Sequence, residues 1–519
     1  MTSRGTEYDV VIAGAGPTGL TLACELRLAG VRVLVLERLT ELDPTLKAGS
    51  INVPTAEAFY RRGLLPAMHE EQRRGYERMK EFIRSKVPES ASGLPPKMPK
   101  LAGHFAGIMV GGEHVRFDDP AFRDVGPAGE VMLVPQQAVE SILDARAREL
   151  GVEIRRGVEL TGFGEDEDGD GDGVTVRFGD GSVRAGWLVG CDGGRSLVRK
   201  TAGFDFPGTD PLITGRQALV DLTGGEALGP GWNRTERGLY VNGPLPGRIL
   251  TVELDGPPAD RDAPITAAEL QASLRRVSGV DVTITAVHSA TRYTDNARQV
   301  PEYRRGRVLL AGDAAHVHSP FGGQGLNLGV GDAMNLGWKL AATVLGGAPD
   351  GLLDTYTAER HPIGEWVLEW TRAQVALMRT DVRTGLLRGV VGDLLSTPDG
   401  STYLAKKLSG VLHRYDMGDR GHDWIGLGTP DLAFADGTRL GEHCAKGAFV
   451  LLDLADSAEL RELVAPWGAR IELVTAKAAS DAEPSGLLMR PDGHVAWARD
   501  GGSLDGLAEA LHRWAGAPG

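Results

Sequence analysis

Short apolar runs alternate with helix-like stretches over the first 200 residues. The runs Tyr8–Ala13 and Val31–Leu36 flank one helix-like stretch, and two more cover Thr55–Arg62 and Gln136–Leu150. This order of strand and helix signals is typical of a doubly wound α/β sheet. A less regular stretch, Pro88–Gly129, interrupts the alternation.

The pattern changes near residue 201. In Arg248–Leu254 and Val280–Val287, apolar and polar residues alternate with the period of a strand. Residues 201–292 are therefore predicted to form a β-sheet that is inserted into the first domain. Helical patterning returns in Gly331–Leu345 and in Leu352–Arg379.

The C-terminal part follows the turn-rich segment Thr397–Ser401 and is predicted to be a compact α/β unit. Its strands are expected near Ala448–Leu454 and Ile471–Thr475. The predicted domains are a discontinuous first domain of residues 1–200 and 293–395, an inserted sheet domain of residues 201–292, and a C-terminal domain of residues 396–519.

A glycine-rich turn, Gly14–Leu20 (GAGPTGL), follows the first apolar run. Gly14 can supply the tight turn, Gly16 the close backbone approach to a pyrophosphate, and Gly19 the contact between helix and strand. The pyrophosphate is expected on the N-terminus of the helix that begins there. Glu37 ends the second apolar run about 20 residues further on, where an acidic side chain can accept hydrogen bonds from a ribose.

Two later segments complete the cradle and indicate its cofactor. They are Cys191–Arg199 (CDGGRSLVR) and Leu310–Asn327 (LAGDAAHVHSPFGGQGLN). A single G-x-G-x-x-G cannot separate NAD from FAD. In the last segment, however, Asp313 can hold a sugar-like hydroxyl at a strand end, and the amides of Gly322–Leu326 can face an electron-rich ring. This layout suits the ribityl chain and isoalloxazine ring of a flavin.

Composition and charge exclude several classes of partner. The chain has 519 residues, of which 42% are hydrophobic and 24% charged, as in soluble globular proteins. Its net charge of -14 and its lack of a Lys/Arg run argue against nucleic acid and anionic membranes as partners. Since no basic-then-apolar leader and no apolar run of roughly 18 residues is present, a cytoplasmic protein is expected.

The metal-ligating residue types do not form a metal motif. Two histidines, His316 and His318, stand two positions apart without a nearby carboxylate set, so structural roles are expected for both. The acidic tract Glu165–Gly173 lacks EF-hand spacing and is predicted to be a solvated loop. Three cysteines lack CxxC spacing and are interpreted as small buried residues, namely Cys24, Cys191 and Cys444.

With these motifs the chain resembles the FAD-dependent aromatic hydroxylases, the single-component flavoprotein monooxygenases that act on phenols and aromatic polyketides. The resemblance covers nearly the whole length and implies a Rossmann-like FAD-binding domain. It also implies these FAD-binding residues: Gly14, Gly16, Pro17, Thr18, Gly19, Glu37, Arg38, Lys47, Gln136, Asp192, Gly193, Gly312, Asp313, Gly325, Leu326 and Asn327. The residues expected along the flavin ring are Pro320, Gly322, Gly323 and Gly325.

Two features distinguish this chain within that family. Lys47 stands where the family usually has an arginine, and a point charge cannot reproduce a bidentate fork. The segments Thr294–Gln299, Gly437–Asp453 and Leu487–Arg499 resemble the subgroup with a C-terminal thioredoxin-like domain. Because Cys444 is the only cysteine there, a redox dithiol is excluded and a packing or dimer role is expected. The protein is expected to be a monomer or a homodimer.

The resemblance implies an activity as well. NADPH, rather than NADH, is expected to reduce FAD, O2 to add at the flavin C4a position, and the resulting hydroperoxide to attack an electron-rich aromatic carbon. The chain has no second G-x-G-x-x-G after an apolar strand, so the pyridine nucleotide is expected to bind only transiently. No side chain is assigned as a nucleophile, because the cofactor carries the chemistry.

Several residues in the segments expected to cover the pocket are candidate substrate contacts: Asn52, His104, Trp232, Tyr240 and Tyr293. The sequence leaves open Baeyer–Villiger oxygen insertion and oxidative inactivation of an antibiotic by the same flavin chemistry. A flavin-binding protein without turnover is a remote alternative. A halogenase is disfavoured because the WxWxIP signature is missing and Trp366 and Trp370 have the wrong spacing.

Overall fold

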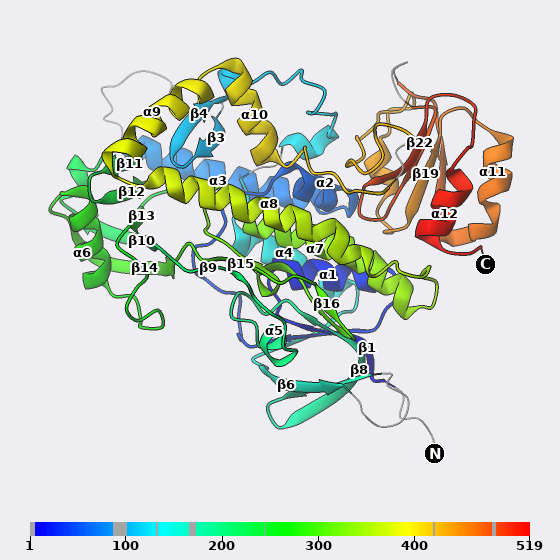
Figure 1. Cartoon of the computed structure of the whole chain (residues 1–519), viewed down its shortest axis with the longest axis horizontal. Coiled ribbons are helices and arrows are strands. Elements are labelled where there is room, and N and C mark those ends of the chain that lie inside the picture. The colour runs from blue at the N-terminus through cyan, green and yellow to red at the C-terminus, as the bar shows by residue number, and fades with distance from the viewer. Residues whose placement is uncertain are drawn as a thin grey trace.

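The chain forms two sheet domains, joined by long helices, and a separate C-terminal unit in the computed structural model (Figure 1). The structure describes residues 6–86, 101–130, 133–165, 173–243, 245–418, 421–479 and 484–518. Most of the acidic tract predicted at 165–173, and residues 88–100 of the less regular stretch, lie outside the described residues. The described remainder of that stretch contains a hairpin of β3 (Leu101–Phe105) and β4 (Ile108–Gly111).

The first domain is built on parallel strands in the order β17-β8-β1-β2-β5. Their bounds are β1 (Tyr8–Ala13), β2 (Val33–Glu37), β5 (Glu153–Arg156), β8 (Gly181–Gly190) and β17 (Val308–Leu310). Val11, Ile12 and Leu34 are fully buried, as expected of hydrophobic runs in a parallel sheet. The sheet is extended by β6 (Leu160–Glu165), β7 (Val174–Phe178) and β16 (Arg304–Arg305). The predicted α/β sheet is confirmed.

The helices of this domain confirm the predicted pattern with one shift. The predicted helices correspond to α1 (Pro17–Leu28), α2 (Val53–Arg61), α4 (Gln136–Glu149), α7 (Gly325–Val344) and α8 (Thr355–Met378). α1 packs against α4 and α7, and the domain also contains α3 (Leu65–Lys86) and α5 (Leu197–Thr201). Because α7 begins at Gly325 rather than at the predicted Gly331, its first helical turn contains Gly325, Leu326 and Asn327. The predicted pattern did not include α3, whose sequence is mostly polar.

The middle domain is an antiparallel sheet in the order β11-β12-β13-β10-β14. Its elements are β10 (Thr214–Thr223), β11 (Gly231–Thr235), β12 (Gly238–Asn242), β13 (Arg248–Glu253), α6 (Ala267–Ser278) and β14 (Thr283–Tyr293). One face of the sheet packs on α6. The small sheet beside it contains β9 (Gly208–Thr209), β15 (Ala297–Gln299) and β18 (His316–Val317). The predicted inserted sheet is confirmed.

Two helices follow α8, namely α9 (Val382–Leu395) and α10 (Pro398–Ser409). The segment predicted as turn-rich at 397–401 is in fact the start of α10, so that prediction is wrong. The physical reason is helix capping, since the Thr397 hydroxyl accepts a hydrogen bond from the Gly400 amide at 3.1 Å and Pro398 occupies the first turn. α10 packs against β3.

The C-terminal unit has a four-stranded sheet in the order β20-β19-β21-β22. Its elements are β19 (Phe449–Asp453), α11 (Ala458–Val464), β20 (Ile471–Thr475), β21 (Gly486–Met489), β22 (Val495–Arg499) and α12 (Leu507–Ala515). Both strands predicted in this part are confirmed. In Figure 1 this unit lies at the end of the molecule opposite α9. None of the described helices is long and apolar enough to cross a membrane.

Candidate functional site

Four neighbouring parallel strands of the first sheet end at the same edge. The residues that end or follow β17, β8, β1 and β2 are, in that order, Gly312, Asp192, Gly14 and Glu37. Open α/β sheets bind their ligands at the carboxyl ends of the strands. The segments predicted from three distant parts of the sequence therefore meet in one cradle.

The three glycines of the first turn have different surroundings. Gly14 has φ +104° and a Cβ there would overlap the Cys191 carbonyl, while a Cβ on Gly19 would overlap the Gly14 carbonyl. At Gly16, by contrast, no described atom beyond its chain neighbours lies within 4 Å of a Cβ position. The open space lies at the N-terminus of α1, where a pyrophosphate fits.

Pro17 and Thr18 form the first turn of α1. The proline occupies a position where its missing N–H leaves no helical hydrogen bond unmade. The Thr18 side chain lies against Gly312 and Gly329, where a Cβ would overlap it. Small residues therefore let α1, α7 and the end of β17 approach closely behind the cradle.

Glu37 is held in place by two backbone amides. One carboxylate oxygen accepts from the Ala15 amide and the other from the Leu39 amide, both at 2.8 Å. Each oxygen keeps a further lone pair, so the carboxylate can also accept hydrogen bonds from a ribose. Arg38 is exposed beside it.

The Asp192 carboxylate has one satisfied and one free oxygen. Its Oδ2 accepts from the Leu197 and Val198 amides, at 2.7 and 3.1 Å, and so caps α5. Its Oδ1 is buried and has no hydrogen-bond partner among the described residues. Gly193 has φ +80° and open space where a Cβ would stand. A buried carboxylate oxygen without a donor fits a site that a polar cofactor completes.

The segment predicted to face the flavin ring is shaped by three glycines with positive φ. These are Gly312, Gly322 and Gly323, at +62°, +89° and +64°. Asp313 is exposed at the start of a single 3-10 turn. Beyond Pro320, the first turn of α7 contains Gly325, Leu326 and Asn327.

This segment is fastened to α2 by two asparagines. The Asn327 side chain accepts from the Asn52 amide at 2.8 Å and donates to the Gly323 carbonyl at 2.9 Å. Asn52 in turn caps α2, because its side chain accepts from the Thr55 amide at 3.1 Å. The structure therefore places Asn52, a predicted substrate contact, behind the loop as a capping residue.

Lys47 and Gln136 have partners within the chain. The Lys47 ammonium pairs with Asp43 at 2.8 Å and remains 39% exposed. Gln136 begins α4 and donates to Glu140 at 2.8 Å, and its backbone amide donates to the Ala48 carbonyl. Burial raises the pKa of Glu140, while Lys47 opposes that shift. The loop that carries Lys47 is thus tied to the start of α4.

Three of the predicted substrate residues meet in an aromatic cluster. The His104 and Trp232 rings are 4.7 Å apart, and Trp232 and Tyr293 lie 6.2 and 6.0 Å from Phe321. Phe321 belongs to the flavin-ring segment between Pro320 and Gly322. The face of the middle sheet that carries Trp232 and Tyr293 is therefore continuous with that segment, and His104 of β3 packs on the same cluster. Tyr240 is separate, since it packs on the α6 side of the sheet.

The cluster contains polar groups that the fold leaves unsatisfied. In the described part of the chain, the Tyr293 hydroxyl and the Arg248 Nε are buried without hydrogen-bond partners. Burial raises the pKa of Tyr293. Burial, with Arg248 and Arg388 nearby, lowers the pKa of His104 to about 4, so this imidazole is neutral at physiological pH. Such groups favour a ligand that offers both apolar surface and oxygen atoms.

Sequence reasoning missed four residues that frame this cluster. Gln374 accepts from the Ala106 amide at 3.0 Å and donates to the Phe321 carbonyl at 3.2 Å. Arg388 donates to the Ala106 carbonyl at 2.7 Å. One signal was available, because Phe321 is the only aromatic residue between Pro320 and Asn327. No comparable signal was available for the other three, because Arg248, Gln374 and Arg388 lie within ordinary strand and helix patterns.

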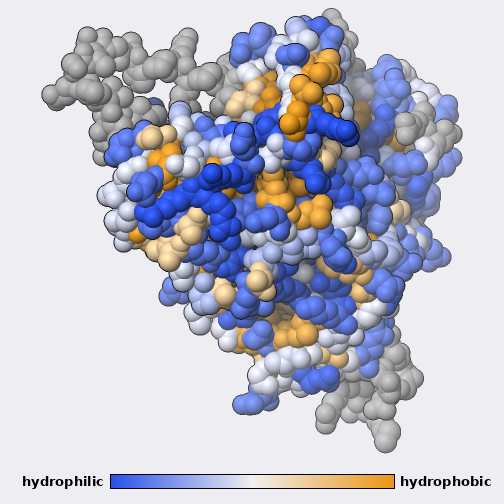
Figure 2. All heavy atoms as spheres, turned by 60° about the vertical axis from the view of Figure 1, so that its left-hand side comes forward, coloured by the Kyte–Doolittle hydropathy of each residue, from blue (hydrophilic) through white to orange (hydrophobic). Residues whose placement is uncertain are grey.

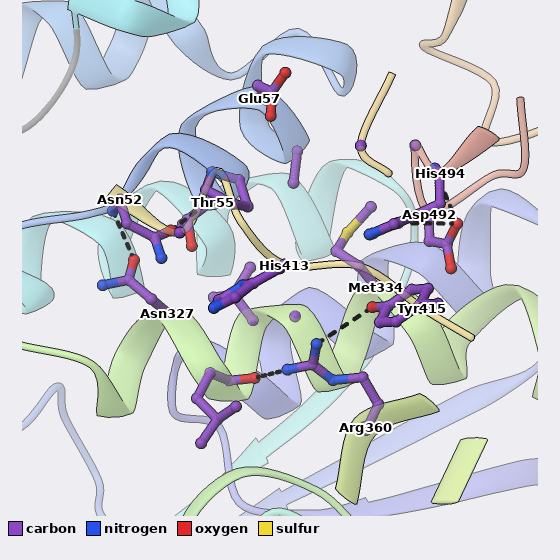
Figure 3. Close-up of a pocket in the computed structure, with 18 of the residues that line it drawn as sticks. Asn52, Thr55, Glu57, Asn327, Met334, Arg360, His413, Tyr415, Asp492 and His494 are labelled. Carbon is purple, nitrogen blue, oxygen red and sulfur yellow. Dashed lines mark hydrogen bonds and ion pairs between the residues drawn. The ribbon is translucent and has the colours of Figure 1, made fainter. Parts of the chain in front are cut away.

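A cavity lies behind the flavin-ring segment, between α2, α7, α8 and the C-terminal unit (Figure 3). Its volume of about 60 Å³ has room for a few water molecules. Arg360 crosses its floor, donating to the Leu328 carbonyl at 3.0 Å and to the Tyr415 hydroxyl at 3.2 Å. Burial lowers the pKa of His413 in this cavity to about 3.

Of the histidines and cysteines that the sequence analysis singled out, His316, Cys24 and Cys444 are buried, whereas His318 and Cys191 are only partly buried. Their structural roles stay predictions. The His316 Nε2 lies 2.7 Å from Asp332, and both side chains are fully buried. Cys24 and Cys444 are buried, and Cys191 is half-buried at the end of β8. No group of three metal-ligating side chains occurs within the described ranges.

Two parts of the chain match known protein families. Residues 7–371 match the family model of the FAD binding domain, and residues 422–518 match that of the aromatic-ring hydroxylase C-terminal domain. The chain therefore belongs to the FAD-dependent aromatic-ring hydroxylases and is a flavin-dependent monooxygenase. Its cofactor is FAD, with NAD(P)H and O2 as co-substrates.

Individual relatives span the whole chain. The 12-dehydrotetracycline 5-monooxygenase/anhydrotetracycline 6-monooxygenase of Streptomyces rimosus is 42% identical, over 98% of this chain and 99% of its own. The rifampicin monooxygenase of Streptomyces venezuelae is 39% identical, over 98% and 99%. The solved structure of the anhydrotetracycline hydroxylase from Streptomyces rimosus has a TM-score of 0.84 at 40% identity, covering 99% of this chain and 100% of that one.

Proposed function

We propose that this monooxygenase hydroxylates a polycyclic aromatic substrate of polyketide type and prefers NADPH to NADH. The observation that carries the proposal is the aromatic cluster of His104, Trp232 and Tyr293, which is continuous with the flavin-ring segment through Phe321. A flat fused-ring molecule offers the apolar surface that this cluster complements. The tetracycline monooxygenase at 42% identity supports the same substrate class.

The residues around the cluster hold and orient the substrate. FAD, when bound, supplies oxygen activation with electrons from the nicotinamide. The Tyr293 hydroxyl and Arg248 Nε would bind the oxygen atoms of the substrate, since both are buried and lack partners among the described residues. Gln374 and Arg388 fix the hairpin that covers the cluster, which excludes water from the reacting carbon.

FAD would be held by the residues predicted from the sequence. Gly16 and the first turn of α1 suit the pyrophosphate, Glu37 the ribose, and Asp192 and Asp313 the remaining polar groups of the cofactor. Lys47 would contribute charge rather than a bidentate contact, because it already pairs with Asp43. We further propose a cytoplasmic location and the three domains predicted from the sequence.

A second candidate is oxidative inactivation of an antibiotic, including Baeyer–Villiger insertion of oxygen beside a ketone. It is favoured by the rifampicin monooxygenase that is 39% identical over 98% of this chain. The same cofactor cradle and the same aromatic cluster would serve that reaction. The two candidates differ in the product, because hydroxylation leaves the carbon skeleton intact and insertion places oxygen within it.

Product analysis with a panel of polycyclic phenols and ketones tests the proposal. FAD-loaded enzyme is supplied with NADPH or NADH, and substrate-stimulated oxidation of the nicotinamide and product mass are measured. The proposal predicts faster NADPH oxidation with the phenols and products that gain one oxygen on a ring carbon. Ester or lactone products would favour the second candidate. Nicotinamide oxidation that yields only hydrogen peroxide would overturn the substrate class.

A further inference from the structure

Helix α9 carries an uncovered hydrophobic stripe. Five large apolar side chains on it are exposed, by 57 to 80%: Val382, Leu386, Leu387, Val390 and Leu394. Four of them are spaced four residues apart, so they form one ridge along the helix. Figure 2, which turns this end of the molecule forward, shows hydrophobic side chains gathered in patches on its upper part.

The opposite face of α9 is fixed to the domain. Leu395 is buried, and Val391 packs against the hydrophobic core that contains Phe321. Arg388 donates to the Ala106 carbonyl at 2.7 Å. The helix cannot turn its stripe inward without breaking these contacts. It also contains Gly385, Gly389 and Gly392, and each glycine lowers helix stability by about 1 kcal/mol relative to alanine. A helix of this composition gains from packing against a partner on its free face.

The stripe is complementary to itself when reversed. If a second copy of α9 lies antiparallel about a two-fold axis at residue 388, Val382 faces Leu394 and Leu386 faces Val390 of the other copy. In the same register Arg383 comes level with Asp393 of the other copy. Both charged side chains are exposed, and neither takes part in an ion pair within the described part of the chain. Two-fold contacts of this kind are the commonest in soluble oligomers.

We propose that α9 is a homodimer interface, formed by two antiparallel copies of the helix with reciprocal Arg383–Asp393 ion pairs. Self-complementarity of both the apolar ridge and the charges favours a second copy of this chain over an unrelated partner. Because the C-terminal unit lies at the other end of the molecule (Figure 1), the dimer would carry its two C-terminal units at its outer ends.

Sedimentation velocity of the full-length FAD-loaded protein over a range of concentrations tests this surface. Wild type is expected to dimerise. Arg383→Asp and Asp393→Arg, each of which sets like charges against each other, are expected to raise the dimer Kd at least tenfold. The double variant R383D/D393R is expected to return the Kd to within about threefold of wild type. Both residues lie on the surface, so the circular dichroism spectra of the three variants are expected to match that of wild type.

A matched pair of leucine substitutions separates the stripe from general surface charge. Leu386→Asp is expected to abolish the dimer, whereas Leu345→Asp, at another exposed leucine after α7, is expected to leave it intact. A protein that stays monomeric at every concentration would overturn the proposal. A dimer whose Kd is the same in Arg383→Asp, Asp393→Arg and Leu386→Asp would also overturn it, because the interface would then lie elsewhere.

Discussion

Two tyrosines of the middle sheet were equal candidates in the sequence and have different surroundings in the structure. Tyr240 packs on α6, and its hydroxyl accepts from the Gly229 amide at 3.1 Å. The Tyr293 ring lies against Phe321, and its hydroxyl has no partner among the described residues. Strand periodicity separates the two faces of a sheet. Which face meets the flavin-ring segment depends on tertiary packing, and no local pattern records that.

Removing the Tyr293 hydroxyl is expected to affect substrate use and not folding. Tyr293→Phe should lower kcat/KM for the best phenolic substrate roughly 5- to 10-fold, the loss of about one hydrogen bond. Its thermal midpoint should equal that of wild type or exceed it, since the hydroxyl has no partner to lose. Steady-state kinetics and thermal unfolding measure the two effects.

Tyr240→Phe is the matched control, because it removes the same atom from the other face. It should lower the stability by about 1 kcal/mol and leave kcat/KM unchanged. If both variants keep wild-type kcat/KM, the Tyr293 hydroxyl does not contact the substrate.

The glycines of the first turn are expected to respond differently to alanine. Gly16→Ala should fold normally, because its φ of -76° suits alanine and the space beside it is open. It should nevertheless raise the Kd for FAD about tenfold or more, since the methyl group would stand where the pyrophosphate approaches. Flavin fluorescence titration of the apoprotein measures this Kd.

Gly14→Ala provides the contrast. At φ +104°, with the Cys191 carbonyl in the way, alanine should destabilise the whole domain. Equal FAD affinity in wild type and Gly16→Ala would contradict the placement of the pyrophosphate.

At the scale of elements, the sequence predicts what periodicity and capping encode. The buried strands β1 and β2 are hydrophobic runs bounded by glycine and acidic residues, so their position was readable. The start of α7 was not, because the glycines of residues 322–325 read as loop in any context. The sequence did not predict α9, because its exposed leucines depart from the amphipathic pattern of a surface helix. It did not predict α10, because the Thr-Pro at its start was interpreted as a turn.

Helix α8 shows an element whose stability depends on another domain. Its Glu359 carboxylate accepts from both terminal nitrogens of Arg490 at 2.8 Å and from Lys339 at 2.8 Å, in a fully desolvated cluster. These partners hold the pKa of Glu359 down at about 2, although burial alone would raise it. Burial lowers the pKa of Lys339 to about 7. The C-terminal unit is therefore joined to α7 and α8 by buried charges.

Glu359→Gln is expected to destabilise this joint. The variant leaves the buried Lys339 ammonium without its carboxylate partner and leaves Arg490 with Asp492 alone. Breaking a buried ion pair in this way costs about 3–5 kcal/mol. Urea unfolding followed by circular dichroism measures the loss. Glu369→Gln, at an exposed position of the same helix, is the control and should change the stability by less than about 0.5 kcal/mol. A loss of similar size in both variants would refute the special role of Glu359.

At the scale of the whole molecule, buried charged contacts join the first domain to the C-terminal unit, and this junction was the part least visible in the sequence. The Arg62 guanidinium pairs with Glu25 at 2.6 Å. It also donates hydrogen bonds to the Cys444 and Pro491 carbonyls of the C-terminal unit. The hydrogen bonds from Arg62 to these two carbonyls join residues hundreds of positions apart, so no spacing in the sequence indicates them. The cofactor cradle, by contrast, was predictable because glycine and acidic residues must stand at strand ends.

Stability is expected to fall in acid. The pKa of Glu359 is about 2 in the folded protein and about 4.5 when unfolded, so its stabilisation is complete above about pH 4.5 and is lost as pH falls toward 2. Buried His413, with a pKa of about 3, acts in the same direction from its usual pKa of 6.5 downward. Urea unfolding at pH 7, 5 and 4 should show this decline. In Glu359→Gln the decline between pH 5 and pH 4 should be smaller, and an unchanged decline would contradict the assignment.

The proposed hydroxylation requires transfer of one oxygen atom from O2 to a ring carbon of the substrate. The most direct test supplies the FAD-loaded enzyme with NADPH and its best polycyclic phenol under 18O2, with a parallel reaction in 18O-labelled water. One labelled oxygen atom is expected in the product from 18O2 and none from water. Fragmentation is expected to locate the label on the aromatic skeleton. Label that enters from water, or a protein that binds no FAD, would contradict the proposed hydroxylation.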